Sequence, residues 1–559
     1  MSTIREEYGR WCRLVKDTEL AGELSTLADA PDALEDAFYR PLVFGTGGLR
    51  GILGAGTNRM NLYTVRRATI GLADYLRERD TGEKRVAIGY DTRINSRLFA
   101  EVAATTLAAR GIRVHLYDAP LPTPLLSFAV RELACDAGIM ITASHNPSHY
   151  NGYKVYGADG SQITEQTASD ILSHINAADY FESASPFSFA EGLARGSISY
   201  VPQEIYRRFI EKIGSLSMRF GDKADKTVSI VYTPLNGTGY VPVTEVLRQN
   251  GYRNLTVVKE QAEPDGTFPT CPSPNPELPE ALSLGLSYAK QLQADLLLAT
   301  DPDCDRVGVA VREGDDYRLL SGNEVGVLLL DYVAAQRVRH GRMPGSPIAV
   351  KTIVTTKLAE QVARKYGIGL INVLTGFKYI GETICNLEKK SESNRYIFGF
   401  EESCGYLSDT HVRDKDGVNA AYLIAEMCAF YKAQGLGLAE RLEEIYREFG
   451  YMQNSLFSYS FPGAKGFEKM QSIMSRLRSG IDAFGRFSVT DVTDYRCGIN
   501  ELPKSDVLQF KLSEGCSFVI RPSGTEPKIK IYTSVRAENK KAASELTSCL
   551  RCSIEKSFR

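Results

Sequence analysis

The segment at residues 140–154 holds the side chains best suited to covalent chemistry. An apolar run at residues 137–141 ends in Thr-Ala-Ser-His-Asn-Pro, so a buried strand would deliver the Ser144 hydroxyl into a polar turn. His145 is the next residue, and Lys154 follows shortly after. Because a strand end fixes a side chain and a turn exposes it, Ser144 is a candidate for covalent catalysis. An Asx-type turn that only closes the strand is the alternative.

A second cluster combines three carboxylates. They stand at alternate positions just past the apolar run at residues 295–300, as Asp301, Asp303 and Asp305. Carboxylates spaced in this way can converge on one hard cation, and oxygen ligands suit Mg²⁺. An EF-hand is excluded, because its sixth loop position would be Arg306 in place of Gly and its twelfth Arg312 in place of Glu. A solvated acidic turn is the alternative.

Two further segments are rich in hydrogen-bond donors. Residues 44–51 form a Gly-rich turn that ends near Arg50, and they match neither a P-loop nor a full G-x-G-x-x-G. Backbone amides beside a guanidinium can bind an anion, although Gly clusters more often serve turns. Residues 521–528 join two apolar runs and offer more donors than a hairpin needs, which favours a phosphate site over a plain turn. The donors there include Arg521, Ser523, Gly524 and Thr525.

Two other strand ends carry polar groups. Residues 401–403 read Glu-Glu-Ser after an apolar run, and these groups could bind the vicinal hydroxyls of a sugar. Adjacent residues on an extended segment point apart, so the two acids are poorly placed as a glycosidase pair. Lys378 lies in the turn at residues 375–378. It could transfer a proton or contact a phosphate, and a surface lysine is the alternative.

The elements that must position these groups follow an α/β pattern. Short, continuously apolar runs alternate with amphipathic stretches, which is typical of βαβ units with strands covered on both faces. The expected strands are at residues 85–90, 114–117, 228–232, 255–258, 295–299, 348–354 and 396–400. The expected helices are at residues 98–110, 324–336, 356–366 and 418–434. Near the C-terminus we expect strands at residues 518–521 and 529–535 and then a final helix.

The chain length of 559 residues predicts about four domains. A Ser/Ala/Phe-rich patch at residues 181–199 is interpreted as a linker, and the charged turn at residues 312–317 as a second separator. The predicted domains are residues 1–198, 199–312, 313–436 and 437–559.

Composition narrows the class of protein. Hydrophobic residues make up 43% and charged residues 24%, and the net charge is −2, which does not suggest a nucleic-acid or membrane partner. The first residues lack the apolar core of a signal peptide, and we find no apolar stretch long enough to cross a bilayer. Eleven scattered cysteines indicate reduced thiols, so we expect a cytoplasmic protein.

These pieces, in this order, resemble the α-D-phosphohexomutase family, which includes phosphoglucomutases and phosphomannomutases. The resemblance covers nearly the whole chain. It rests on a phosphoserine loop (142–147), a metal loop (301–306), a sugar loop (401–405) and a phosphate loop (521–528). It implies three related α/β domains with mixed sheets and a smaller C-terminal α+β domain, all around a central cleft.

The resemblance also implies a role for each candidate residue. Ser144 would carry the transferable phosphoryl group, and Mg²⁺ would be held by a phosphate oxygen on Ser144 together with Asp301, Asp303 and Asp305. The groups around the phosphoryl group would be Arg50, His145, Lys154 and Arg306. Lys378 would be a general acid/base, and Glu401 and Ser403 would contact sugar hydroxyls. The non-reacting phosphate would be bound by Arg521, Ser523, Gly524 and Thr525.

The implied activity interconverts glucose 1-phosphate and glucose 6-phosphate through a phosphoserine and a sugar 1,6-bisphosphate. Partners would be sugar phosphates and a bisphosphate primer, with the chain a monomer or weak homo-oligomer. Two departures matter: Cys304 replaces a small residue such as Ala, and Phe400 stands where hexose-specific members often have Gly.

Residues 151–154, 375–378 and 413–417 resemble the phosphoglucomutase-2/phosphopentomutase branch. A phosphopentomutase and a glucose 1,6-bisphosphate synthase therefore remain alternatives. A sugar-phosphate sensor without activity is disfavoured because Ser144 and the aspartates are intact. A serine hydrolase is disfavoured because His145 adjoins Ser144 and is badly placed as its base.

Overall fold

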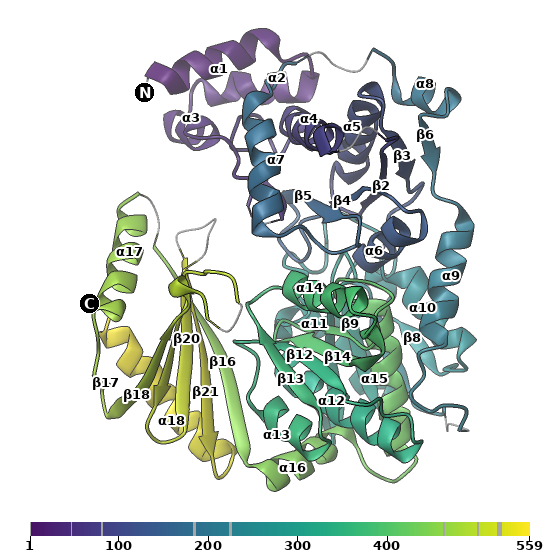
Figure 1. Ribbon diagram of the computed structural model, residues 1–559, viewed down its shortest axis with the longest axis vertical. Helices are drawn as coiled ribbons and strands as arrows, with labels where there is room; N and C mark the ends of the chain where they lie inside the picture. Colours follow the sequence, from purple (N-terminus) through teal and green to yellow (C-terminus); the bar gives the residue numbers. More distant parts are fainter. Residues whose placement is uncertain are drawn as a thin grey trace.

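The computed structural model describes residues 2–45, 47–79, 82–182, 186–222, 226–461, 464–499, 502–522 and 528–558. This part of the chain forms three α/β units followed by a C-terminal unit built on an antiparallel sheet (Figure 1).

The first unit is built on a mixed six-stranded sheet in the order β1-β5-β4-β2-β3-β6. Its strands are β1 Gly48–Ile52, β2 Arg85–Tyr90, β3 Arg113–Leu116, β4 Ala137–Ile141, β5 Tyr150–Gly157 and β6 Ile198–Tyr200. Strand β2 is parallel to β3 and β4, whereas β5 is antiparallel to β1 and β4. The helices are α4 Leu62–Arg79, α5 Ser96–Ala109, α6 Thr123–Glu132, α7 Glu165–Ala177 and α8 Phe189–Ala194.

Three helices precede this sheet and pack beside α4 and α7 (Figure 1). They are α1 Ser2–Leu14, α2 Thr18–Leu27 and α3 Pro31–Phe38. Their apolar sides meet around Trp11, which is completely buried against Phe38, Tyr63 and Tyr180. The only tryptophan of the chain therefore fixes the N-terminal helices to the first unit.

The second unit has a five-stranded mixed sheet in the order β11-β10-β9-β7-β8. The strands are β7 Ile230–Thr233, β8 Leu255–Val257, β9 Leu296–Thr300, β10 Val307–Glu313 and β11 Asp316–Leu320. Helices α9 Gln203–Gly214, α10 Tyr240–Gln249 and α11 Pro279–Leu292 accompany them, with the short 3₁₀ helix η1 Lys259–Gln261. Every residue of β9 is buried, which explains its unbroken apolar sequence.

The third unit has a four-stranded sheet in the order β13-β12-β14-β15. The strands are β12 Ile348–Thr352, β13 Gly369–Val373, β14 Tyr396–Glu401 and β15 Gly405–Leu407. The helices are α12 Gly322–Arg339, α13 Leu358–Lys365, α14 Phe377–Lys389, η2 Ser393–Arg395, α15 Gly417–Lys432 and α16 Leu438–Phe449. One continuous apolar core joins this unit to the second unit.

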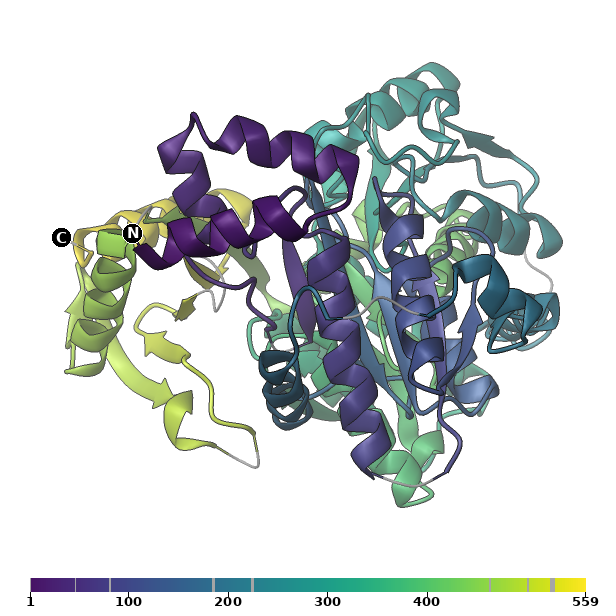
Figure 2. The same cartoon turned by 90° about the horizontal axis from the view of Figure 1, so that it is seen from above.

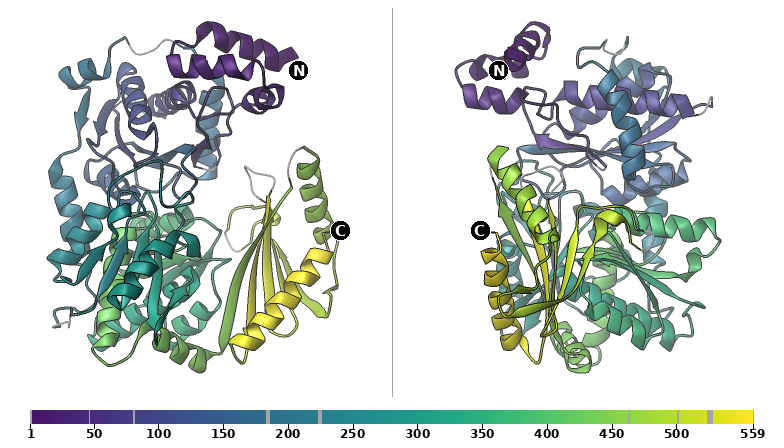
Figure 3. Two further views of the ribbon diagram at one scale, coloured as in Figure 1. Left: turned by 180° about the vertical axis from the view of Figure 1, so that it is seen from behind. Right: turned by 60° about the vertical axis from the view of Figure 1, so that its left-hand side comes forward.

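The C-terminal unit has an antiparallel sheet in the order β16-β21-β20-β19-β18-β17. Its strands are β16 Tyr451–Ser460, β17 Ala483–Phe484, β18 Phe487–Asp494, β19 Leu508–Leu512, β20 Cys516–Pro522 and β21 Lys528–Ala537. Helices α17 Ala464–Arg478 and α18 Lys540–Lys556 cover the side of the sheet away from the third unit (Figure 3), and η3 Tyr495–Cys497 follows β18. Seen from above, this unit lies to one side of the α/β units (Figure 2).

The predicted α/β class and four-unit architecture are confirmed, and the predicted strands and helices fall on observed elements. The interpretation of residues 181–199 as a linker is wrong for its second half, because α8 and the start of β6 lie there and β6 pairs with β3. Residues 312–317 form the turn of the β10–β11 hairpin within the second sheet. The four domain boundaries stay predictions. No helix of the described chain has the length and apolarity needed to span a bilayer.

Candidate active site

Ser144 lies in a tight turn directly after β4. Its φ of 51° is in the left-handed region, which non-glycine residues adopt rarely and often at functional sites. The Ser144 amide donates to Thr142 Oγ1 at 2.8 Å, which stabilises the turn. The Ser144 hydroxyl donates to Asp301 Oδ2 at 2.8 Å and lies 3.2 Å from His145 Nδ1. The structure therefore brings the predicted nucleophile against the predicted metal loop, although 157 residues separate them in sequence.

The three aspartates of the metal loop converge as the sequence predicted. Asp301, Asp303 and Asp305 are buried, and one carboxylate oxygen from each lies within 4.8 Å of the others. Burial, and then the carboxylates of Asp303 and Asp305, raise the pKa of Asp301 well above its ordinary value. Within the described chain, Oδ1 of Asp303 and Oδ1 of Asp305 have no hydrogen-bond partner. Buried oxygens of this kind fit a bound cation, so the triad fits the metal site of the resembled family.

The backbone of the metal loop is shaped by its own first aspartate. Asp301 Oδ1 accepts from the amides of Asp305 and Arg306 at 3.1 and 3.0 Å. Cys304 is completely buried at the turn with a φ of 50°. Burial and nearby carboxylates raise the pKa of the Cys304 thiol well above its ordinary value, so the thiol is protonated at neutral pH. Because the thiolate is the reactive form of cysteine, the raised pKa makes the Cys304 thiol less reactive.

Two lysines offset the negative charge of the triad. Lys154 on β5 donates to Asp303 Oδ2 at 2.9 Å. Burial alone would lower the pKa of Lys154, but Asp303 and Asp305 outweigh it and raise the pKa. Lys415 Nζ lies 3.2 Å from Asp305 Oδ2 and 3.1 Å from Asp414 Oδ1. Lys415 had no predicted role, and its only signal in the sequence was the segment at residues 413–417.

The predicted arginines and histidine also meet near the turn. Arg50 on β1 donates to Asn146 Oδ1 at 3.2 Å, from an exposed position. Arg306 forms an ion pair with Glu277 at 2.6 Å. Burial, and then the positive charges of Arg306 and Arg50, lower the pKa of His145 well below its ordinary value. The imidazole of His145 is therefore neutral at physiological pH.

The sugar loop begins where β14 ends. Ser403 Oγ donates to Glu401 Oε1 at 3.0 Å, and Glu401 Oε2 is buried without a partner in the described chain. The neighbouring Glu402 Oε2 accepts from Thr352 and Thr355 at 3.1 and 3.2 Å. Thr352 ends the neighbouring strand β12 and Thr355 follows it closely, so the end of β12 holds Glu402.

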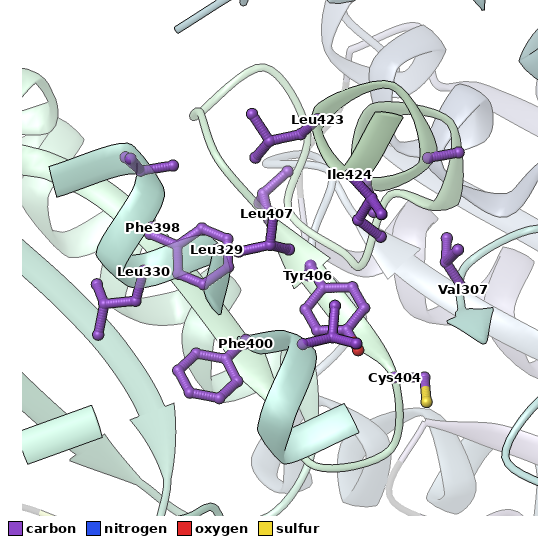
Figure 4. Close-up of a cluster of buried hydrophobic side chains, with 14 of the residues drawn as sticks. Val307, Leu329, Leu330, Phe398, Phe400, Cys404, Tyr406, Leu407, Leu423 and Ile424 are labelled. Carbon is purple, nitrogen blue, oxygen red and sulfur yellow. The ribbon is translucent and has the colours of Figure 1, made fainter. Parts of the chain in front are cut away.

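Phe400 points away from this polar surface. Its ring is 1% exposed and lies 5.6 Å from the Phe398 ring, two residues earlier on the strand. Figure 4 shows both rings among Leu329, Leu330 and Tyr406 in the core. Because side chains alternate along a strand, Phe400 faces the core and Glu401 the opposite side. Phe400 is therefore no direct contact for a sugar, and its difference from glycine does not by itself decide substrate choice.

The remaining predicted groups have their contacts away from the serine turn. Lys378 on α14 donates to Glu165 of α7 at 2.7 Å, and the Tyr379 hydroxyl donates to the same oxygen at 2.5 Å. Arg521 on β20 is the register partner of Lys530 on β21. Ser523, Gly524 and Thr525 lie outside the described residues.

Three family descriptions match the chain in order. They are phosphoglucomutase/phosphomannomutase alpha/beta/alpha domain I at residues 41–182, domain II at residues 207–314 and domain III at residues 321–449. Together they cover more than half of the chain. The helices α1 to α3 and the C-terminal sheet lie outside the matched ranges.

Curated relatives match over nearly the whole chain. A phosphoglucomutase of Staphylococcus haemolyticus is 36% identical over 529 residues, covering 91% of this chain and 93% of the relative. A phosphoglucomutase of Staphylococcus aureus (strain MW2) is 37% identical over 524 residues, covering 90% and 91%.

Solved structures share the fold. The open form of Paramecium parafusin, a phosphoglucomutase, has a TM-score of 0.68 at 19% identity and covers 92% of this chain and 95% of its own. A phosphoglucomutase/phosphomannomutase family protein of Burkholderia thailandensis has a TM-score of 0.66 at 19% identity and covers 92% and 97%.

Proposed function

The chain belongs to the phosphoglucomutase/phosphomannomutase family, and we propose that it is a phosphoglucomutase that interconverts glucose 1-phosphate and glucose 6-phosphate. The observation that carries this proposal is the Ser144 hydroxyl, held 2.8 Å from Asp301 within a buried carboxylate triad. Phosphoryl transfer needs accurate positioning and neutralisation of charge more than covalent assistance, and this arrangement supplies both.

The proposed metal is Mg²⁺, held by Asp301, Asp303 and Asp305 together with a phosphate oxygen on Ser144. Mg²⁺ bound there would neutralise charge on the transferred phosphoryl group. Hard oxygen ligands support this choice over a soft metal, as do the two carboxylate oxygens that have no hydrogen-bond partner among the described residues.

In the proposed cycle, phosphorylated Ser144 gives its phosphoryl group to a hydroxyl of the sugar monophosphate, and the proton of that hydroxyl passes to Lys378 as the general base. The bond between Ser144 Oγ and phosphorus breaks as the new sugar phosphate ester forms, and the sugar 1,6-bisphosphate turns over within the site. Its other phosphate then returns to Ser144, which regenerates the phosphoenzyme and leaves the isomeric product. A bisphosphate primer would load Ser144 at the start.

The remaining residues complete the proposed site. Around the phosphoryl group, cationic and neutral donors would be supplied by Arg50, His145, Lys154 and Arg306. Lys378 would be the general acid/base, and Glu401 and Ser403 would bind sugar hydroxyls. The non-reacting phosphate would be bound by Arg521, Ser523, Gly524 and Thr525. Lys415, which contacts Asp305, would help to neutralise the negative charge of the triad, because, against the effect of burial, Asp305 and Asp414 raise its pKa and keep it protonated.

The chain's segments at residues 151–154, 375–378 and 413–417 support membership of the phosphoglucomutase-2/phosphopentomutase branch. Comparing kcat/KM for glucose 1-phosphate and ribose 1-phosphate decides between the sugars, and a clear preference for the pentose would replace our choice. Net accumulation of glucose 1,6-bisphosphate from 1,3-bisphosphoglycerate would instead indicate the synthase.

We also propose a cytoplasmic enzyme, supported by eleven free cysteines, and a monomer or weak homo-oligomer. The predicted domains 1–198, 199–312, 313–436 and 437–559 remain our proposed division of the chain.

The decisive experiment maps phosphate on the protein after incubation with glucose 1,6-bisphosphate. We expect phosphate on Ser144, and we expect Ser144→Ala to abolish both the label and the mutase activity. Ser148→Ala, in the same loop, is the matched control and should retain both. Undiminished turnover of Ser144→Ala with saturating bisphosphate would refute the proposal.

A further inference from the structure

A buried arginine holds the backbone of the serine loop. The Arg93 side chain is fully enclosed in the turn after β2. One terminal nitrogen, Nη1, donates to the carbonyls of Pro147 and Tyr150 at 2.9 and 3.0 Å. The other, Nη2, donates to the carbonyl of Ser144 at 2.5 Å and to that of Asn146. One guanidinium therefore satisfies four carbonyls of the loop that carries the proposed nucleophile.

The guanidinium is itself fixed by an acidic partner. Arg93 Nε lies 3.4 Å from Asp91 Oδ2, and both side chains are fully buried. The other carboxylate oxygen of Asp91 accepts from the Arg93 amide at 3.0 Å and from Ser96 Oγ at 2.7 Å. A planar fork of donors held in this way cannot be replaced by the single ammonium group of lysine.

The same turn is docked against the second unit. The Arg93 guanidinium carbon lies 5.1 Å from the centre of the Phe268 ring, and Arg93 forms a parallel bridge with Gly266. A Cβ atom at Gly266 would come within 2.6 Å of the Ile94 amide nitrogen and the Thr92 carbonyl oxygen. The loop of the second unit that contains Gly266 therefore packs its backbone directly against the backbone of the turn, and only glycine fits at position 266.

Arg93 links the serine loop to the second unit through contacts that do not involve the Ser144 hydroxyl. The serine loop belongs to the first unit, whereas Asp301 and the rest of the triad belong to the second. Arg93 touches the loop of Ser144 on one side and the second unit at Gly266 and Phe268 on the other. Arg93 is thus one of the links that set the position of Ser144 relative to the triad, beside the hydrogen bond from Lys154 to Asp303, and among these links it acts on the backbone of the serine loop.

We propose that Arg93 is a positioning residue for phosphoryl transfer, which holds the serine loop in register with the aspartate triad. The proposal rests on the proposed function. Arg93 acts through the loop carbonyls, so it affects the transfer step and leaves the sugar contacts in place. A displacement of about 1 Å in a reacting group can slow a reaction about 100-fold.

The test compares Arg93→Lys and Arg93→Met with Arg97→Met as the matched control. Arg97 lies on the adjacent helix α5 with a 65% exposed side chain. Each protein is labelled with glucose 1,6-bisphosphate, and single-turnover transfer from phosphoserine to glucose 6-phosphate is measured beside steady-state KM. We expect both Arg93 variants to transfer about 10- to 100-fold more slowly, with KM changed less than about threefold. The control should match the unmodified chain.

Backbone hydrogen exchange gives a readout that needs no activity. In Arg93→Lys we expect amides at residues 143–152 to exchange at least about tenfold faster, while those of the third unit stay unchanged. Unchanged exchange in this loop, or full transfer by Arg93→Lys, overturns the positioning role. If Arg93→Met fails to fold, Arg93→Lys alone decides the matter.

The two proposals fail separately. Absence of phosphate on Ser144 in the unmodified chain refutes the proposed function. Amide hydrogen exchange of residues 143–152 in the Arg93→Lys variant still tests the positioning role in that case. A loss of activity explained entirely by a rise in KM would also overturn the positioning role.

Discussion

Charge near Ser144 is paired with opposite charge at short range. Asp303 lies against Lys154, and Asp305 lies against Lys415, at 2.9 and 3.2 Å. Buried ions of one sign are costly without partners, so the two lysines reduce the cost of negative charge on Asp303 and Asp305. The two carboxylate oxygens that lack a hydrogen-bond partner in the described chain, Oδ1 of Asp303 and Oδ1 of Asp305, mark where a cation would contribute most.

We predict that Asp303→Asn weakens activation by magnesium. The substitution removes one negative charge and one hard oxygen ligand, so we expect the Mg²⁺ concentration for half-maximal activity to rise more than about tenfold. Titration of activity with Mg²⁺ after chelation with EDTA measures this. Asp316→Asn, at a 77% exposed aspartate of the same unit, is the control and should behave like the unmodified chain. Equal titration curves for Asp303→Asn would contradict the metal assignment.

Glu402 should make thermal stability depend on pH. Burial, and then the neighbouring Glu401, raise the pKa of Glu402 to about 7 from an ordinary value of 4.5. A carboxyl with a raised pKa stabilises the fold fully only below its unfolded pKa, and this contribution is lost as pH rises from the unfolded pKa through the folded one. The loss amounts to roughly 3 kcal/mol.

Glu402→Gln cannot ionise and should escape this loss. We therefore expect its melting temperature to rise relative to the unmodified chain between pH 5 and pH 8. Thermal melts at several pH values measure the difference. Parallel curves over this range would show that the pKa of Glu402 is not raised in the folded protein.

At the scale of elements, strand β14 places a site residue on one face and a core residue on the other. Glu401 contributes to the sugar loop, and Phe400 packs in the core against helix α12. The closest point of this packing is Gly326, where a Cβ atom would lie 2.0 Å from the Phe400 ring. The helix can approach the strand only because residue 326 has no side chain.

We predict that Gly326→Ala destabilises the protein by about 1–3 kcal/mol, because the added methyl overpacks the core beneath the sugar loop. KM for the sugar phosphate should also rise as β14 and Glu401 shift. Denaturation and steady-state kinetics measure the two effects. The double variant Gly326→Ala/Phe400→Leu should recover part of both losses.

A helical glycine in open space provides the control. Gly22 on α2 has no atom within 4 Å of the place that a Cβ atom would take, so Gly22→Ala should be neutral or stabilising by up to about 1 kcal/mol. If Gly326→Ala were equally harmless, α12 would have to pack less closely on β14 than described.

At the scale of the whole molecule, the first and third units are joined by polar contacts near the site. Arg131 of α6 donates to the carbonyls of Thr410 and His411, both at 3.0 Å, and to Glu388 at 2.9 Å. Tyr156 on β5 donates to Asp414 at 2.8 Å. These contacts hold the loop that precedes Lys415.

We predict that Arg131→Met destabilises the protein by about 1–3 kcal/mol and lowers kcat, because the loop before Lys415 loses its attachment to the first unit. Urea denaturation and kinetics measure this. Arg208→Met is the control, since Arg208 pairs with Glu132 from a 49% exposed position and should contribute less than about 1 kcal/mol. A larger effect of the control would refute the assignment.

The sequence alone determined the α/β class and the approximate positions of the buried strands, and it named the candidate site residues as predictions. Continuous apolar runs identify buried strands, and polar residues just after them must emerge at a sheet edge. For this reason Ser144 and the aspartate triad could be named from the sequence. Local sequence spacing was enough to name these residues because each group directly follows a strand of its own.

The tertiary structure decided which distant groups share one space. Nothing local links Arg93 to the carbonyls of the serine loop, or Lys415 to Asp305, since these pairs are separated by whole elements. The same holds for Lys378, whose partner Glu165 belongs to another unit. The face on which Phe400 lies also depended on the pairing of β14. These contacts depend on strand pairing and packing between residues far apart in the chain, so they could not be predicted from the spacing of residues in the sequence.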